Sequence, residues 1–366
     1  MHLRDDDIGC STGPKRWSTP YIRFVWPRCP FSSKLIRTQG GRRGFVTEAI
    51  TDTQDINTQA AAYCPVCETE VHGTVVLSYD SEVFGKRYDL LRCPECGTGI
   101  CVPQLTDDDL ETYYTEEEVV GAGLYEKWLK KYRYIHDWIV PFTGGRGRAA
   151  ELGCNSANQL RYFHERGWDV LGFEFSKECQ EYAKRVNDVE VTGTMLAQFN
   201  AEHPEQTFDL FLLIHTFEHI TNPAALLADL KQALASDGLL YIEVPNVDSW
   251  SYDWLGEFDN VARLPFHSYI YTQQSLRQLL QRCGYEVVAE RPYSMKEDGG
   301  LLTRSLEQSL RFRLQRRLGR NIVSRAIGTV LKWIIRFYPN RLLITKLAGQ
   351  RGKSASFAIL ARPLPP

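Results

Sequence analysis

The chain has 366 residues, of which 43% are hydrophobic and 24% are charged, and its formal net charge is −2. This composition is ordinary for a globular protein, and the balanced charge excludes any global sign of a nucleic-acid-binding surface. The length exceeds that of one typical domain and predicts a large domain with an appendage.

The first 60 residues have no periodic apolar pattern, and no apolar core follows the acidic Asp5, Asp6 and Asp7. A secretory signal would need a basic start and an apolar core, and a membrane span would need an apolar run of roughly 18 residues. We therefore expect a cytoplasmic protein without a nucleic-acid partner. We also expect residues 1–60 to be disordered or foreign to the native protein, because they cannot bury enough apolar surface to offset their ordering entropy.

Two tight cysteine pairs, Cys64-Pro-Val-Cys67 and Cys93-Pro-Glu-Cys96, are separated by 25 residues. Two thiolates at this spacing can bind one metal from one turn, and two such turns give the four-sulfur site of structural zinc. Gly97 provides the backbone freedom that the second turn needs. We predict that residues 61–105 form a zinc ribbon, with two unrelated reduced pairs or a redox pair as the alternatives.

A helical pattern in residues 106–145 predicts a linker, and β and α patterns alternate from residue 146 to 366. Near-continuous apolar strands in such an alternation predict a doubly wound, mostly parallel α/β sheet that is covered on both faces. The expected strands are residues 148–152, 169–174, 208–215, 238–244, 286–289 and 356–360. The expected helices are residues 156–166, 177–186, 223–234 and 276–283.

Residues 295–352 interrupt this alternation with a helical, basic pattern before the last strand. One hypothesis is that residues 301–347 lie on an anionic membrane, at its inner face, near a lipid-linked acceptor. The other is that they form a helical lid or a dimer surface with solvated charges.

Ligands of a doubly wound sheet bind beyond the carboxyl ends of its strands. The first strand ends in Glu151-Leu-Gly153-Cys-Asn155-Ser-Ala157, and the second ends in Glu174. Gly153 permits close backbone approach, Asn155 tolerates a left-handed turn, and the Glu174 carboxylate can accept both hydroxyls of a ribose. These features fit NAD or S-adenosylmethionine (SAM). The glycine-rich cradle that a dinucleotide pyrophosphate needs is missing, which disfavours NAD.

Four stretches together resemble class I SAM-dependent methyltransferases, closest to a branch from bacterial polysaccharide, glycolipid and natural-product pathways in which similar cysteine pairs recur. They are residues 151–157, His215-Thr-Phe-Glu-His-Ile-Thr-Asn-Pro223, residues 238–246 and His267-Ser-Tyr-Ile-Tyr-Thr. Ala157 stands where that branch has a glycine. The resemblance covers residues 63 to about 290 and implies a Rossmann-like sheet of seven strands.

The resemblance also implies roles for individual residues around SAM. The methionine end is expected at Glu151, Gly153 and Asn155, the ribose at Glu174, the adenine at Phe175 and Leu196, and the sulfonium at His215. Glu151 could instead cap a helix or pair with a cation, and Glu174 could be a solvated strand end.

Methyl transfer needs an aligned acceptor and, for a hydroxyl or a carbon acid, a base that removes a proton. Histidine suits that role near neutral pH, and the candidates are His215, His219 and His267, the last with Tyr269 nearby. A structural role would also explain each histidine.

Similar sugar C-methyltransferases carry a glutamate before the later histidine, where this chain has Phe266. A glutamate–histidine base pair is therefore expected to be missing, which favours methylation of a hydroxyl on a saccharide, glycolipid or natural product. The alternatives are a sugar C-methyltransferase, a non-catalytic protein with the SAM-binding fold, and an NAD-dependent oxidoreductase.

Overall fold

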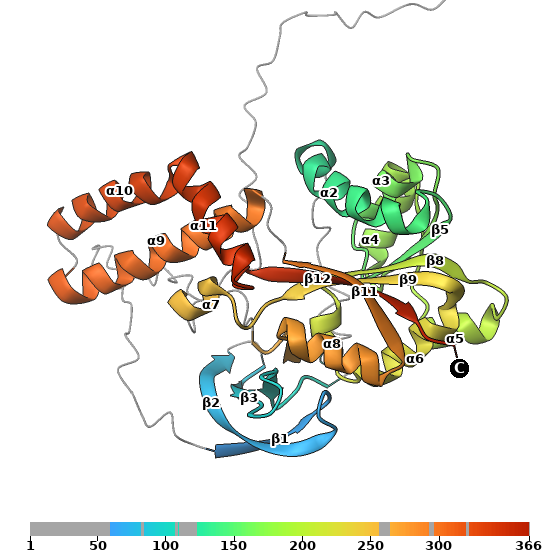
Figure 1. The fold of residues 1–366 in the computed structure, drawn as a ribbon, viewed down its shortest axis with the longest axis horizontal. Helices are drawn as coiled ribbons and strands as arrows, with labels where there is room; N and C mark the ends of the chain where they lie inside the picture. Colours follow the sequence, from blue (N-terminus) through green and yellow to red (C-terminus); the bar gives the residue numbers. More distant parts are fainter. Residues whose placement is uncertain are drawn as a thin grey trace, which may run out of the picture. The chain divides into compact units, whose positions relative to one another are not determined.

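The computed structural model describes residues 59–81, 84–106, 109, 123–255, 264–292, 296–319 and 322–365 (Figure 1). All of them belong to one unit, Asp55–Pro366. The prediction for residues 1–60 therefore lies almost entirely outside the described residues. The first part of the predicted helical linker, up to residue 122, also lies largely outside them.

Seven strands form the larger sheet. They are β5 Arg148–Leu152, β6 Asp169–Phe173, β7 Glu190–Thr192, β8 Phe208–Ile214, β9 Leu234–Pro245, β11 Tyr285–Pro292 and β12 Ser356–Pro363. Their order across the sheet is β11-β12-β9-β8-β5-β6-β7. The pairings among β5 to β9 are parallel, and β12 pairs antiparallel with both neighbours, so β12 alone runs against the other six strands. The prediction of a mostly parallel seven-stranded α/β sheet is confirmed.

Helices cover both faces of this sheet, with α2, α3 and α4 on one side and α5, α6 and α8 on the other (Figure 1). Their bounds are α2 Tyr125–Thr143, α3 Asn158–His164, α4 Lys177–Tyr182, α5 Leu196–Glu202, α6 Pro223–Ala233 and α8 Gln273–Arg282. Side chains fix several starts: Ser176 caps α4, Asn222 caps α6, and Thr272 forms a capping box with Ser275 at α8. The central strands are apolar because both faces are buried.

The cysteine pairs lie in a second, antiparallel sheet of five strands, β1-β2-β3-β4-β10. The strands are β1 Gln59–Cys64, β2 Thr69–Ser81, β3 Lys86–Arg92, β4 Gly99–Val102 and β10 Tyr269–Ile270. The fifth strand comes from the segment just before α8, and it pairs Tyr269 with Ile100 and Ile270 with Gly99. The small sheet is thus completed by a strand from the chain that builds the larger one.

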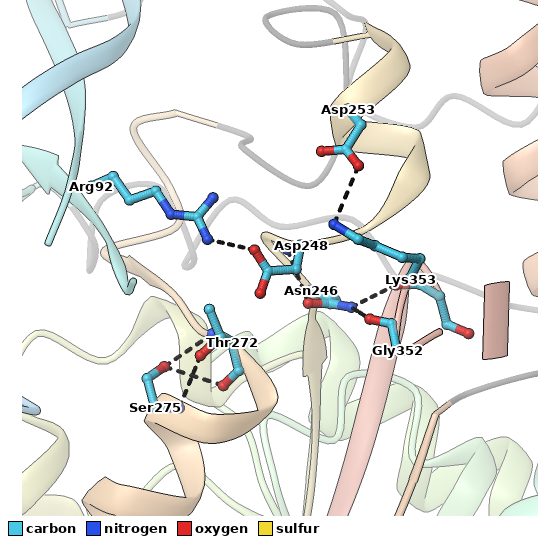
Figure 2. A network of polar contacts seen from close by, with 9 residues as sticks. Arg92, Asn246, Asp248, Asp253, Thr272, Ser275, Gly352 and Lys353 are labelled. Atoms are coloured by element: carbon cyan, nitrogen blue, oxygen red, sulfur yellow. Dashed lines mark hydrogen bonds and ion pairs between the residues drawn. The ribbon is translucent and has the colours of Figure 1, made fainter. Parts of the chain in front are cut away.

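Two arginines also join the cysteine segment to the larger sheet. The guanidinium of Arg282, at the end of α8, donates to the carbonyl oxygens of Pro65 and Val66 and lies 3.2 Å from the Glu68 carboxylate. From β3, Arg92 pairs with Asp248 (Figure 2).

The loop that carries Asp248 is itself fixed by Asn246, at the end of β9. The Asn246 amide donates to the carbonyl oxygens of Gly352 and Ser354, and its own oxygen accepts the N–H of Asp248 (Figure 2). The loop after β9 is therefore held from both the small sheet and the start of β12.

Four further helices lie outside the layers around the sheet. They are α7 Trp250–Leu255, α9 Lys296–Leu318, α10 Ile322–Arg336 and α11 Tyr338–Gln350. The last three fill the chain between β11 and β12, where the sequence predicts a helical insertion, and α9 packs against α7, α10 and α11. Among the helices built from described residues, none has the length and apolar content to cross a bilayer.

Replacing Arg282 by glutamine tests the link between the cysteine turn and α8. The substitution removes a charged donor from two carbonyl oxygens, so the free energy of unfolding should fall by about 2 kcal/mol in chemical denaturation. The exposed Arg133 pair with Asp137 provides a matched control, since Arg133→Gln should cost less than about 0.5 kcal/mol. Equal losses in the two variants would contradict a role for Arg282 in docking.

Candidate functional site

The loop after β5 has an unusual backbone. Gly153, Asn155 and Ala157 have φ angles of 71°, 44° and 53°, all in the left-handed region. A Cβ atom on Gly153 would lie 2.8 Å from Oγ1 of Thr216, whose hydroxyl donates to the carbonyl oxygen of Leu152. Glycine is therefore required where the ends of β5 and β8 approach each other. Ala157 also has a left-handed φ, which glycine adopts without steric cost, and this explains why similar sequences have glycine at this position.

Glu174, directly after β6, joins the ends of the first two strands. Its carboxylate accepts the N–H groups of Asn155 at 2.9 Å and of Ser176 at 3.0 Å, and the side chain is buried. The following Phe175 is 48% exposed, whereas Leu196 packs in the hydrophobic core. Glu174 and Phe175 thus lie at the carboxyl edge of the sheet, and Leu196 presents little surface there.

Glu151, on β5, is a buried carboxyl group near two other carboxylates. Burial raises its pKa to about 8; Lys131 of α2 opposes the rise, and Glu174 and Glu243 add to it. Its Oε2 atom accepts no hydrogen bond from the residues that the structure describes. A buried oxygen atom without a hydrogen-bond donor destabilises the fold, and a cationic donor from a ligand would satisfy it.

His215 follows β8 and lies between two buried glutamates. Its Nε2 is 3.1 Å from Glu243 Oε1, and its Nδ1 is 3.6 Å from Glu218 Oε1. Burial disfavours the charged ring, but the two carboxylates outweigh burial and raise the pKa of His215 to about 9. Its φ of 56° is rare for a residue with a side chain and places the ring at this edge.

Glu218 is shared with a second histidine from a distant segment. Nε2 of His267 lies 3.9 Å from Glu218 Oε1, and the His267 ring packs edge-on against His219 at 4.9 Å between centroids. Burial opposes ionisation of Glu218, but His215, His219 and His267 together hold its pKa below the usual value. Ligand atoms of Glu218, His219 and His267 lie within 4.8 Å of one another, so this trio could also hold one cation.

The expectation that a glutamate–histidine pair is missing is wrong. Phe266 does precede His267, but Glu218 supplies the carboxylate from the other side of the site. Glu218 lies within the motif from His215 to Pro223, but nothing in the linear pattern predicts that Glu243 lies beside His215 or that Lys131 lies near Glu151.

Hydrogen bonds from neighbouring segments hold the two remaining catalytic candidates. Nδ1 of His219 lies 2.8 Å from the carbonyl oxygen of Phe266, so a proton on Nδ1 is donated to that oxygen. The Tyr269 hydroxyl donates to the carbonyl oxygen of Thr221. Tyr269 also lines a surface cavity of about 570 Å³, whose lining includes none of His215, His219 and His267.

The four paired cysteines converge on one point. Sγ of Cys64 is 3.6 Å from Sγ of Cys96, Sγ of Cys67 is 3.8 Å from Sγ of Cys93, and all four lie within 4.8 Å of one another. None of them forms a disulfide. Each pair closes a similar turn, with left-handed residues Glu68 and Gly97 donating their N–H groups to Cys64 and Cys93. This arrangement can hold one metal ion.

Comparison with known proteins identifies the domain that contains most of this site. Residues 125–290 match the model of a methyltransferase domain family, and the match begins with the first residue of α2 and ends within β11. This segment is thus similar to methyltransferase domains, and the match covers just under half of the chain.

Individual relatives are distant. The chain is 27% identical over 121 residues to (S)-coclaurine N-methyltransferase of Thalictrum flavum subsp. glaucum, which covers 30% of this chain and 34% of that protein. The match thus spans about a third of the relative's length. Among solved structures, coclaurine N-methyltransferase bound to N-methylheliamine and SAH has a TM-score of 0.40 at 18% identity, covering 63% of this chain and 72% of that one. A SAM-dependent methyltransferase from Archaeoglobus fulgidus has a TM-score of 0.42 at 17% identity, covering 66% and 99%.

The carboxylates around His215 predict a ring that is protonated at neutral pH. Glu243→Gln removes one of them and should lower the pKa of His215 clearly below the wild-type value of about 9, as an NMR titration of the ring can show. Because the folded-state pKa lies above that of the unfolded chain, the stabilisation from this charge is complete below about pH 6.5 and is lost as pH rises through about 9. The exposed Glu286→Gln is the control, and an unchanged titration in Glu243→Gln would refute the pairing.

Proposed function

We propose that the protein transfers a methyl group from SAM to a hydroxyl of a saccharide, glycolipid or other natural product. The observation that carries the proposal is the convergence of four buried carboxylates, the buried His267 and the partly exposed His215 at the carboxyl edge of the parallel sheet. They are Glu151, Glu174, Glu218, Glu243, His215 and His267. The match to the methyltransferase domain supports it independently.

The residues at the ends of β5 and β6 fit the chemistry of SAM. SAM supplies an electrophilic methyl group on a sulfonium, and its methionine part adds an ammonium group. Glu151 offers a buried acceptor to that ammonium, whose charge would favour the ionised form of a carboxyl with a pKa of about 8. Glu174 would hold the ribose hydroxyls, Gly153 and Asn155 would border the methionine end, and the exposed Phe175 would face the adenine.

The acceptor end of the site contains the candidate base. His267 is almost fully buried, which excludes bulk water from its ring, and Glu218 lies 3.9 Å from its Nε2. A buried carboxylate raises the basicity of a neighbouring imidazole and stabilises the imidazolium that forms when the ring accepts a proton. In this proposal His267 takes the proton of the acceptor hydroxyl, Glu218 balances the resulting charge, and His219 orients the His267 ring.

The same pair of residues supports a second candidate. Because Glu218 and His267 form the glutamate–histidine pair that carbon deprotonation needs, a sugar C-methyltransferase is the alternative activity.

The cysteine cluster would hold a structural Zn²⁺ in this proposal. A tetrahedral site with Zn–S bonds of about 2.3 Å separates its sulfur atoms by about 3.8 Å, and two of the sulfur pairs here are 3.6 and 3.8 Å apart. Four thiolates fill the coordination sphere and leave no position for a substrate. The ion would instead fix the turns that Arg282 and β10 join to the segment carrying His267.

The decisive experiment combines binding with product identification. Isothermal titration should show SAM binding, and incubation with methyl-labelled SAM and cell fractions should yield a labelled product. NMR of that product separates a methyl ether from a carbon-bound methyl group. SAM binding without any labelled product would favour a non-catalytic binding protein, and binding of NAD in place of SAM would reject the methyltransferase.

His267→Gln should reduce kcat by about 10²- to 10⁴-fold, the usual contribution of a general base, while the Kd for SAM stays nearly unchanged. Glu218→Gln should lower the pKa of the base, which shifts the acidic limb of the kcat profile to lower pH, and it should reduce kcat less. The exposed His203→Gln is the matched control and should leave both constants unaltered. If His267→Gln keeps more than half of the wild-type kcat, the base is another group.

Metal analysis of the purified protein should find about one zinc ion per chain. Cys96→Ser should lose the metal and lower the midpoint of thermal unfolding, because folding and metal binding are coupled. Cys283→Ser changes a thiol outside the cluster and should retain the zinc. A wild-type protein that folds fully and binds no zinc when refolded with it would disprove the assignment.

A further inference from the structure

Helix α10 has one side that packs against the protein. Ser324 and Ile335 are buried, Gly328 lies against the side chain of Arg311 on α9, and α10 contacts both α9 and α11. These positions recur at helical spacing, so they form the inner side of α10.

A second side of α10 is apolar and open to solvent. Val323, Ile327, Val330 and Ile334 follow one another at intervals of four, three and four residues, which places them in one stripe of α10. Trp333 lies beside this stripe, and Phe337 directly follows the helix. Their exposed fractions range from 38% for Ile327 to 76% for Trp333. We call these six residues the α10 face. A patch of this kind on a soluble surface marks an interaction site.

The charge around the α10 face is strongly positive. Residues 301–353 contain thirteen Lys and Arg residues and one acidic residue, Glu307, in a chain whose net charge is −2. This segment therefore carries +12 and the rest of the chain −14. Arg311, Arg313, Arg317, Lys332 and Lys346 are exposed.

We propose that the α10 face inserts in the plane of the membrane–water interface of an anionic lipid bilayer. Interfacial helices combine an apolar side containing Trp and Phe with a basic polar side, and basic residues gain from anionic headgroups. At 15 residues α10 is too short to span a bilayer. A second copy of the chain is a poorer occupant, because it would bring two segments of charge +12 together.

The insertion also contacts the segment that follows β9. Helix α9 packs against α7, and Lys353 pairs with Asp253 of α7 at 3.3 Å while its carbonyl oxygen accepts the N–H of Trp250 (Figure 2 shows the Lys353–Asp253 pair). Helix α7 follows the loop at the end of β9. A bilayer at α10 would therefore favour an acceptor with a lipid anchor. This preference for the acceptor rests on the proposed function, whereas the proposed membrane binding does not.

The test is sedimentation of the full chain with vesicles of phosphatidylcholine alone or mixed with phosphatidylglycerol. Wild type should pellet with the anionic vesicles, and high salt should weaken the binding because the headgroup attraction is screened. The triple variant Val330→Ser, Trp333→Ser, Ile334→Ser should lose at least tenfold in vesicle affinity. Its matched control, Phe142→Ser with Val186→Ser, alters exposed apolar residues on α2 and next to α4 and should bind like wild type.

Quenching by bromine-labelled acyl chains reports the depth of Trp333. Wild type should be quenched more than Trp333→Phe, which keeps the other seven tryptophans. SAM binding and circular dichroism confirm that each variant is folded, so a failure of methyl transfer stays distinct from a failure of membrane binding. Recovery of wild type in the supernatant of anionic vesicles, unaltered pelleting of the triple variant, or a concentration-dependent dimer that this variant abolishes would each overturn the proposal.

Discussion

The site depends on the compensation of buried negative charge. Glu218 and Glu243 are completely shielded from solvent, and an isolated carboxylate in such a position would protonate rather than ionise. The histidine rings around them hold both pKa values below the ordinary range, Glu243 at about 2. His215 is charged for the same reason, and Tyr241 stabilises Glu243 with a hydrogen bond of 2.7 Å. Burial outweighs the opposing charge of Lys131 at Glu151, so the pKa of this carboxyl group rises instead. The protein thus presents one unbalanced acid where a cationic ligand would bind.

The second sheet contributes to this arrangement by fixing the segment of His267. Ser268 donates to the carbonyl oxygen of His219, and the carbonyl of Ser268 accepts the N–H of Cys101 on β4. The next two residues, Tyr269 and Ile270, form β10 and pair with β4. The histidine pair is therefore held between the larger sheet and the cysteine sheet.

The sequence predicted local structure far better than tertiary proximity. Strand β5 has the expected bounds, and β6 and β8 each end one residue earlier than expected, because apolar runs and flanking glycines are local signals. Gly97 adopts the left-handed conformation that the cysteine spacing requires, with a φ of 74°. In contrast, Glu218 and His267 are 49 positions apart, and tertiary hydrogen bonds such as that from Ser268 to the carbonyl oxygen of His219 bring their segments together. The short β7, α5 and β10 were not foreseen, since two to seven residues give too little periodicity.

The net charge of the chain conceals two regions of opposite local charge. Because they lie apart in the sequence, the net charge alone gives no sign of either region. The buried glutamates at the sheet edge suit a cationic methyl donor, whereas residues 301–353 carry a charge of +12. Summed over the chain, these contributions nearly cancel, so the value of −2 indicates neither partner. Attraction to a ligand depends on the local potential, which decays within about 8 Å at physiological salt. Because residues 301–353 contain most of α9 and all of α10 and α11, which lie outside both sheets, the two charged regions belong to different parts of the fold.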